Sequence, residues 1–363
     1  MIKKLLLISV AVILLSGLFF ACTKTTPTGS TPTSSATTAP VAVGTKLYTG
    51  IYTYRDTAFQ EDAQRFVDEL KAMTNGQLVL TPKLESSLGN MEEGLQNLGQ
   101  GLFQCGGLAQ GYSSGLDPAL LFAGASNFEM IYKNIYDYVT LEFKYGIADV
   151  YQREVYDKLN VRMIWPIPMP TETIVSTYPI KSPDDLKNHK FRSFGSAAKT
   201  LEAFGAQTVW FPGSEIYSSL ASGVIDGATY ESHSIMYKLG IQEVAKYWTN
   251  QSITIFGATY RYVNKDWWSS LPAHLQQCFI IASANAGYRN YFELTQKDDE
   301  ARMAVAKAGV TLSQWSDKDI DRWSNTYFKV TCSDMIKNNT TVAKCWEILK
   351  RYFTDEGRPI PQF

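Results

Sequence analysis

Residues 214–227 read SEIYSSLASGVIDG and contain one complete helix-to-strand unit. Ser214 is a suitable N-cap for a short helix, and Gly223 is a suitable residue to end it. The apolar residues that follow predict a buried strand over 224–228. A helix followed at once by a buried strand is typical of α/β proteins, in which ligands bind beyond the carboxyl ends of the strands.

The same alternation runs through most of the chain. Runs of alternating or apolar residues predict strands, and apolar residues at helical spacing predict helices between them. The predicted strands cover 46–54, 77–81, 106–109, 162–166, 173–177, 190–193, 208–210 and 224–228, and the first helices cover 58–73 and 91–101. Because helices separate most of these strands, the sequence predicts an α/β fold with mainly parallel sheets.

The C-terminal third is predicted to be helical. Residues 272–308 show a nearly continuous helical pattern with no proline after Pro272, although Gly287 is a point where the helix can break. A second helical region covers 317–352. A helix of this length is unusual in a globular domain, so we expect it to brace two α/β halves.

The N-terminus resembles an export signal that ends in a lipidation site. Lys3 and Lys4 precede an uncharged, mostly apolar run over 5–21, which Cys22 follows directly. We expect residues 1–22 to be a signal peptide with Cys22 as the lipidated residue; a plain signal peptide and an uncleaved anchor are the alternatives. Residues 23–45 consist mainly of Thr, Ser, Pro, Gly, Ala and Val, which predicts an extended tether.

Composition excludes several classes of function. The net charge is −1 and only 19% of residues are charged, so nothing in bulk attracts nucleic acid or an anionic membrane. No CxxC or histidine-rich spacing indicates a metal site, and we expect neither a metal nor a cofactor. In an oxidising compartment a disulfide between Cys332 and Cys345 is our favoured pairing, with buried free thiols as the alternative for them and for Cys105 and Cys278.

Residues 184–197, DDLKNHKFRSFGSA, indicate an anion site. Arg192 ends a predicted strand, and Gly195 and Ser196 begin a helix just beyond it. An arginine beside a helix N-terminus is a common way to hold an anion, but it is also a common structural ion pair. The residues alone leave both interpretations open.

The best enzyme motif is GYSSG at residues 111–115, a formal GxSxG with Ser113 at its centre. A nucleophile elbow needs a hydrophobic strand before the serine and a helix after it, whereas this motif follows a glycine-rich stretch. His189, His233 and His274 lack a recognisable triad context. A turn is therefore the simpler interpretation, and a secreted serine hydrolase stays as an alternative function.

Three segments together resemble the solute receptors of TRAP (tripartite ATP-independent periplasmic) transporters. They are PIKSPDDLKN at 179–188, KFR at 190–192 and SEIYSSLASGVIDG at 214–227, with Asn188 in place of the usual glycine. The resemblance implies a two-lobed α/β periplasmic-binding-protein fold of the type II-like kind, with a long bracing helix across both lobes. It also implies that Arg192 matches the signature arginine that pairs with a carboxylate.

The resemblance implies further site residues. Tyr230 matches the aromatic lid position, and Tyr112, Asn127 and Tyr54 lie in loops that the family places at the cleft. Thr171 lies where the family often has a polar or basic side chain. Glu231, and more weakly Glu172, are candidates only if the ligand also carries a cationic or hydroxyl group, because a carboxylate repels a bound acid. Residues 229 and 254 are threonines where oxo-acid receptors have acidic residues, so no metal is expected there.

The expected organisation follows from the resemblance. Lobe I comprises 46–170 and 253–270, lobe II comprises 171–252, the bracing helix covers 271–308, and 309–363 completes lobe II. Hinges are expected near residues 170 and 252.

The expected function is capture of a small organic acid, a monocarboxylate or a 2-oxo or 2-hydroxy acid, for delivery to TRAP membrane subunits. The protein would be no enzyme, would bind no nucleic acid, and would be held at the periplasmic or cell-surface side of a membrane through Cys22. A ligand-sensing lipoprotein on the same fold is a further alternative. Homodimerisation through the C-terminal helices is left undecided.

Overall fold

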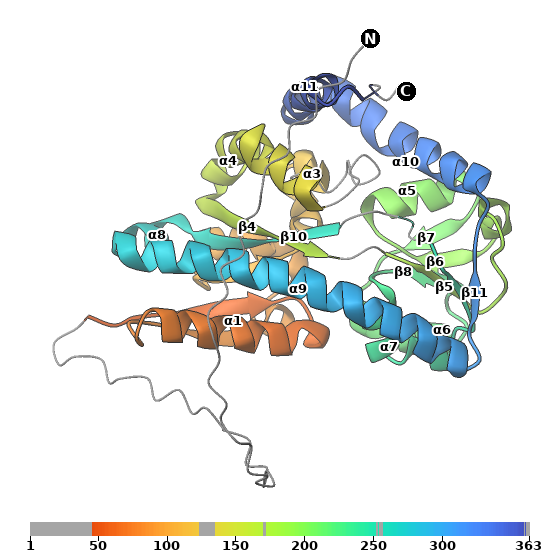
Figure 1. Cartoon of the computed structure of the whole chain (residues 1–363), viewed down its shortest axis with the longest axis horizontal. Helices are drawn as coiled ribbons and strands as arrows, with labels where there is room; N and C mark the ends of the chain where they lie inside the picture. The colour runs from red at the N-terminus through yellow and green to blue at the C-terminus, as the bar shows by residue number, and fades with distance from the viewer. Residues whose placement is uncertain are drawn as a thin grey trace, which may run out of the picture. The chain divides into compact units, whose positions relative to one another are not determined.

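A computed structural model describes residues 46–122, 135–169, 172–251, 253, 257–358 and 360 (Figure 1). In these residues the strands form two sheets, one of five strands in the order β2-β1-β3-β10-β4 and one of six in the order β11-β9-β5-β8-β6-β7. We call the parts built on them the first and the second lobe. This is the expected two-lobed α/β fold.

The first sheet consists of β1 (Tyr48–Tyr54), β2 (Leu78–Leu84), β3 (Cys105–Leu108), β4 (Val161–Met169) and β10 (Gly257–Asn264). The second consists of β5 (Ile174–Ser176), β6 (Lys190–Arg192), β7 (Gln207–Val209), β8 (Gly227–Thr229), β9 (Tyr247–Thr249) and β11 (Thr311–Ser313). β10 runs antiparallel to β3 and β4, and β5 runs antiparallel to β8 and β9. Both sheets are therefore mixed, which corrects the expectation of mainly parallel sheets.

The α-helices of the described residues lie between and after these strands. Their bounds are α1 Gln60–Met73, α2 Gly94–Gly99, α3 Ile135–Val139, α4 Ile147–Glu154, α5 Gly195–Ala203, α6 Ile216–Ala221, α7 His233–Lys238, α8 Lys265–Ser270, α9 Ala273–Lys307, α10 Asp317–Asn338 and α11 Thr340–Asp355. None of the described helices combines the length and the apolar character that crossing a bilayer requires.

The unit at 214–227 folds largely as its sequence predicts, but its strand starts later. Gly223 adopts φ +71°, which ends α6, and Val224 is 53% exposed. The strand β8 begins at Gly227, where the chain first lies between β5 and β6. A side chain at Gly227 would meet the Phe191 ring at 2.3 Å, so glycine is needed for this close pairing.

Helix α9 is continuous and contacts both lobes. It packs against α1 and β4 of the first lobe and against α7 and β11 of the second, as Figure 1 shows. Gly287 does not break it. A Cβ at Gly287 would lie 2.9 Å from the Pro166 carbonyl oxygen, so this glycine lets the helix approach β4 closely.

The C-terminal helices contact different lobes. β11 joins the second sheet and α10 packs on α5, whereas α11 packs on α4 of the first lobe. The expected organisation places the whole of 309–363 in the second lobe, whereas these contacts divide the region between the two lobes. The chain turns at Asn339, whose side chain accepts the N–H groups of Thr341 and Val342 at 3.0 and 3.1 Å.

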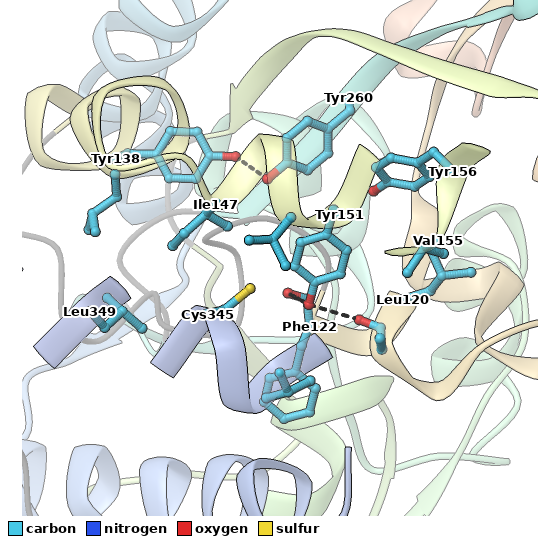
Figure 2. Close-up of a cluster of buried hydrophobic side chains, with 14 of the residues drawn as sticks. Leu120, Phe122, Tyr138, Ile147, Tyr151, Val155, Tyr156, Tyr260, Cys345 and Leu349 are labelled. Atoms are coloured by element: carbon cyan, nitrogen blue, oxygen red, sulfur yellow. Dashed lines mark hydrogen bonds between the residues drawn. The ribbon is translucent and has the colours of Figure 1, made fainter. Parts of the chain in front are cut away.

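The favoured disulfide is absent. Cys332 and Cys345 form no disulfide, and both are fully buried in the hydrophobic core of the first lobe; Cys345 is labelled in Figure 2. Cys345 points into a cluster in which the Tyr138 hydroxyl donates to the Tyr260 hydroxyl at 2.6 Å. Free cysteine behaves there as a small apolar side chain, which explains its burial without a covalent bond.

Candidate ligand cleft

The carboxyl ends of β1 and β8 carry the residues that join the two lobes. Arg55 and Asp56 follow β1 directly, and Tyr230 and Glu231 follow β8 directly. The Arg55 Nη2 group donates to Glu231 Oε1, and the Tyr230 hydroxyl donates to Asp56 Oδ2. Two side-chain contacts from adjacent residue pairs therefore link the lobes at their strand ends.

Tyr230 lies between two guanidinium groups. The Cζ atom of Arg192 is 4.8 Å from the centre of the Tyr230 ring, and that of Arg55 is 5.4 Å from it. Stacking against an aromatic ring stabilises a desolvated guanidinium through the ring quadrupole. The ring thus helps to hold two buried positive charges near the strand ends.

Arg192 is almost fully buried, with 2% of its surface exposed, and its own lobe orients it. Its Nε donates to the Phe211 carbonyl and its Nη1 to the Thr229 carbonyl, both at 2.9 Å. Nη2 has no hydrogen-bond partner among the described residues. The guanidinium is therefore fixed through two of its three nitrogens, while Nη2 keeps N–H groups that can donate to an anion.

Both lobes line a cavity of about 430 Å³. From the first lobe it is bounded by Arg55, Asp56 and Tyr112, and from the second by Trp210 and Tyr230. The Tyr112 and Trp210 rings lie 5.5 Å apart. Arg192 does not line this cavity in the described structure but lies against Tyr230, which does.

Buried carboxyl groups surround the two arginines. Burial, helped by the neighbouring carboxyl of Glu231, raises the pKa of Glu172 to about 8, while Arg192 and Arg55 act to lower it. Burial also raises the pKa of Glu231, and Arg55 opposes this shift. The inner part of the cleft therefore contains both carboxyl and guanidinium groups that water screens poorly.

A much smaller cavity, of about 50 Å³, lies beside the first on the side of the first lobe. Tyr54 and Arg55 line it together with Tyr52, Arg261 and Arg289. Arg261 is buried there and donates to the Ser283 carbonyl at 3.1 Å. Tyr54 therefore borders this small cavity instead of the larger one.

The structure brings only some of the predicted site residues together. Tyr112 and Tyr230 line the larger cavity, and Glu231 and Arg192 contact its lining residues. Asn127, Thr171 and Cys22 lie outside the described residues, as do the hinge positions 170 and 252.

Sequence reasoning missed Arg55, Asp56 and Trp210. The first two immediately follow a correctly predicted strand, so the rule that ligands bind beyond strand ends could have identified them. Trp210 follows β7 in the same way. The predicted strand 208–210 includes Trp210, so the strand-end rule identifies this residue only because the structure ends β7 at Val209.

A serine hydrolase site is not assembled. Ser113 is buried, and its hydroxyl accepts the Leu95 N–H at 3.4 Å. The three histidines of the sequence all bond to other groups. His189 Nδ1 lies 3.3 Å from Asp226, His233 Nε2 lies 2.9 Å from the Thr249 carbonyl, and His274 Nε2 lies 3.0 Å from Gln77.

Over the described ranges, no cluster of three or more His, Cys, Asp or Glu side chains could hold a metal ion. Thr229, one of the two threonines that stand in place of acidic residues, shares a hydrogen bond of 2.7 Å with Ser193. Thr254 lies outside the described residues.

The known proteins that this chain resembles include periplasmic binding proteins. The monocarboxylate 2-oxoacid-binding periplasmic protein of a Nostoc species is 27% identical over 260 residues, which cover 70% of this chain and 69% of that protein. A TRAP periplasmic solute-binding protein of Chromohalobacter salexigens, solved with bound (S)-(+)-2-amino-1-propanol, has a TM-score of 0.76 at 20% identity and covers 88% of this chain and 100% of its own.

A second solved structure, the TRAP periplasmic solute-binding protein of Pseudoalteromonas atlantica with bound sodium and pyruvate, has a TM-score of 0.74 at 19% identity. It covers 86% of this chain and 95% of its own. At these identities the two structures establish the fold alone. The model of the bacterial extracellular solute-binding protein family 7, named DctP, matches residues 50–337. The chain therefore belongs to this family of solute-binding receptors, which is the family that its resemblance to TRAP receptors predicts.

Proposed function

We propose that this protein is the extracytoplasmic receptor of a TRAP-type secondary transporter and captures a small organic acid through Arg192. The observation that carries the proposal is the buried guanidinium whose Nε and Nη1 donate to two backbone carbonyls and whose Nη2 has no partner among the described residues. The relatives that bind monocarboxylate 2-oxoacids and pyruvate support an acid as the ligand.

The proposed mechanism involves binding without bond making or breaking. A carboxylate would accept N–H groups from the outer edge of Arg192, in the two-pronged geometry that suits a guanidinium. The carbonyls of Phe211 and Thr229 hold the fork in place before the ligand arrives, so little ordering entropy is lost on binding. The ligand would shift an open–closed equilibrium of the lobes, and the closed receptor would deliver it to the membrane subunits.

Arg192→Lys tests this role, because lysine keeps the charge but not the fork. We expect a thermal-shift screen of the wild-type protein against monocarboxylates and 2-oxo and 2-hydroxy acids to identify a binder, since a ligand of the native state raises the melting temperature. Isothermal titration should then show binding about 100-fold weaker in Arg192→Lys and in Arg192→Ala, because each hydrogen bond between charged groups contributes roughly 1.5–3 kcal/mol.

Arg322→Ala is the matched control. Arg322 lies on α10 and forms exposed ion pairs with Asp319 of the same helix and with Asp184. It does not line the cavity. Its removal should leave the affinity unchanged. If a folded Arg192 variant binds the acid as tightly as the wild-type protein does, Arg192 is not the carboxylate clamp.

We further propose that Cys22 carries the lipid that anchors the receptor at the outer face of a membrane. The uncharged run before Cys22 and the tether after it support this proposal. Metabolic labelling with a radioactive fatty acid should mark the wild-type protein and fail to mark Cys22→Ser. Equal labelling of both proteins would show that the anchor is elsewhere.

A further inference from the structure

We propose that the ligand is a zwitterion, a carboxylate that also carries an ammonium or alkylammonium group, and that the cavity between the lobes binds its cationic part. The inference deepens the proposed receptor function and rests on it. The residues assigned to the cation are Asp56, Tyr112 and Trp210, with Glu92 and Glu215 at the rim.

The charged residues in the wall of the cavity are mostly acidic. Among its described lining residues, Asp56, Glu92 and Glu215 are carboxylates, and Arg55 is the basic residue. Arg55 is already paired with Glu231, so its charge is balanced by a group of the protein itself. Asp56 Oδ2 also lies 3.7 Å from Arg55 Nε, whereas Glu92 and Glu215 form no ion pair with the described residues. The carboxylates outnumber the basic lining residue, so this wall would repel a negative group and attract a cationic one.

Asp56 lies deepest of the three carboxylates. Its side chain is 16% exposed, while Glu92 and Glu215 are exposed at the rim. Its Oδ1 accepts the Ala58 N–H at 2.8 Å and its Oδ2 accepts the Tyr230 hydroxyl. These bonds fix the carboxylate in position, and each oxygen keeps a second lone pair that a ligand N–H group can approach.

Two aromatic rings complete the acidic wall. Tyr112 and Trp210 line the cavity from opposite lobes with ring centres 5.5 Å apart, and Phe194 supports Tyr112 from behind with centres 5.0 Å apart. Aromatic rings beside carboxylates are the surroundings that recognise ammonium and quaternary ammonium groups. An anion gains nothing comparable from the negative faces of the rings.

Donors for a carboxylate lie next to this acidic wall. Arg55 is 8% exposed and Arg192 is 2% exposed, and both lie against Tyr230. Arg192 Nη2 is a buried N–H group without a hydrogen-bond acceptor in the described part of the chain, and Arg55 Nε, also without a hydrogen bond there, lies 3.7 Å from Asp56 Oδ2. A buried donor left unsatisfied is costly, so these groups are the natural partners of a ligand carboxylate. Guanidinium donors beside Tyr230 and the carboxylates and aromatic rings of the cavity that Tyr230 lines match the two ends of a zwitterion.

A competition experiment tests the inference directly. The full chain, purified in detergent, is incubated with an equimolar mixture of the protein amino acids, their N,N,N-trimethyl betaines, and the 2-hydroxy and 2-oxo acids with the same side chains. After rapid gel filtration, mass spectrometry identifies what the protein retains. We expect an amino acid or a betaine to be retained at least tenfold over the hydroxy and oxo acids of the same side chain.

Asp56→Asn identifies the cation site, because asparagine keeps the helix-capping oxygen but removes the charge. Isothermal titration should show at least tenfold weaker binding of the retained zwitterion and unchanged or tighter binding of its 2-hydroxy counterpart. Glu61→Gln is the control, since Glu61 is an exposed carboxylate that does not line the cavity. It should alter neither affinity.

The possible failures are distinguishable. Retention of a 2-hydroxy or 2-oxo acid in preference to the zwitterions would overturn the inference and leave the carboxylate receptor intact. An equal loss of affinity for both ligand classes in Asp56→Asn would also overturn it, because the aspartate would then act only through the fold. Retention of no compound from any class would instead contradict the proposed carboxylate function itself.

Discussion

At the scale of single residues, the cleft is defined by how its buried charges are compensated. Arg192 is compensated by backbone carbonyls and the Tyr230 ring, and Arg55 by Glu231 and the same ring. Burying a charge without such partners costs several kcal/mol. These contacts are therefore needed for the two arginines to be buried at all. The two arginines differ in that Arg192 has no carboxylate hydrogen-bonded to it among the described residues, whereas Arg55 has one.

Glu85 should make stability depend on pH. It is 4% exposed, and burial raises its pKa to about 8, although Arg55 acts to lower it. Above pH ~4.3 the unfolded chain releases this proton while the folded protein keeps it, so stability falls as pH rises toward 8. The glutamine in Glu85→Gln cannot ionise, so the free energy of unfolding of this variant should fall less between pH 5 and pH 8 than that of the wild type. The two changes should differ by at most about 4 kcal/mol.

Thermal unfolding at pH 5, 6, 7 and 8 measures this difference. The melting temperature of Glu85→Gln relative to the wild type should rise steadily with pH. The exposed Glu61 provides the control, because Glu61→Gln should give a curve parallel to that of the wild type. Parallel curves for Glu85→Gln as well would mean that Glu85 is ionised in the folded protein.

At the scale of elements, the contact between α9 and β4 depends on a missing side chain. Replacing glycine by alanine inside a helix normally stabilises it by about 0.5–1 kcal/mol. At Gly287 the added methyl would lie 2.9 Å from the Pro166 carbonyl oxygen and 3.2 Å from Trp165, and backbone cannot move aside cheaply. We therefore expect Gly287→Ala to destabilise the protein by roughly 1–3 kcal/mol in urea unfolding.

Thr295→Ala provides the comparison on the same helix. Thr295 is exposed on α9, so its replacement by a better helix former should leave stability unchanged or slightly raised. If Gly287→Ala is also neutral or stabilising, α9 has room to shift away from β4, and this contact is not tight in solution.

At the scale of the whole molecule, the two lobes are joined by the Arg55–Glu231 ion pair and the bond from Tyr230 to Asp56. Glu231→Gln would remove the carboxylate that is hydrogen-bonded to Arg55 and leave Asp56, whose Oδ2 lies 3.7 Å from Arg55 Nε, as a more distant partner. Breaking a buried pair in this way costs about 3 kcal/mol. Opening the cleft would return Arg55 to water. We therefore expect the ligand-free variant to populate open forms and to show a larger radius of gyration in X-ray scattering than the wild type.

The double variant Arg55→Gln/Glu231→Gln removes both charges and should recover most of the stability lost in Glu231→Gln. Glu293→Gln is the control, because its pair with Arg65 is partly exposed and joins α1 to α9 without crossing the cleft. A scattering curve of Glu231→Gln identical to that of the wild type would show that the ion pair does not hold the lobes together.

The elements that sequence reasoning found have strong local signals. The helices predicted from apolar residues at helical spacing agree with α1 and α9 to within a few residues, and Gly223 follows α6 as expected. Ser214 does not cap α6, because it lies within the 3-10 turn Gly213–Glu215 and Glu215 takes the N-cap position without a side-chain bond. The missed strands β9 and β11 have only three residues each, and their pairing partners lie far away in sequence. The eight-residue strand β10 was also missed, and its antiparallel position between β3 and β4 makes the first sheet mixed.

The residues of the candidate site likewise divide into those with a local sequence signal and those without one. Arg192 and Tyr230 were predicted because their neighbours match a family pattern over many residues. Arg55 and Trp210 belong to no such pattern in this chain, and nothing local indicates that Arg55 pairs with a residue 176 positions away. The disulfide expectation failed for a related reason, since burial of Cys332 and Cys345 depends on how α10 and α11 pack.

The sequence by itself determined the α/β class, the bracing helix, the receptor family and the choice of Arg192 as a candidate site residue. Each of these follows from residues that are close in the chain, where periodicity, capping and motif spacing act. Only the tertiary structure decided the mixed strand order, the pairing of Arg55 with Glu231, and the acidic, aromatic wall of the cavity. Those features arise where strand ends from distant segments meet, and side chains acquire their charge environment only once the fold has removed them from water.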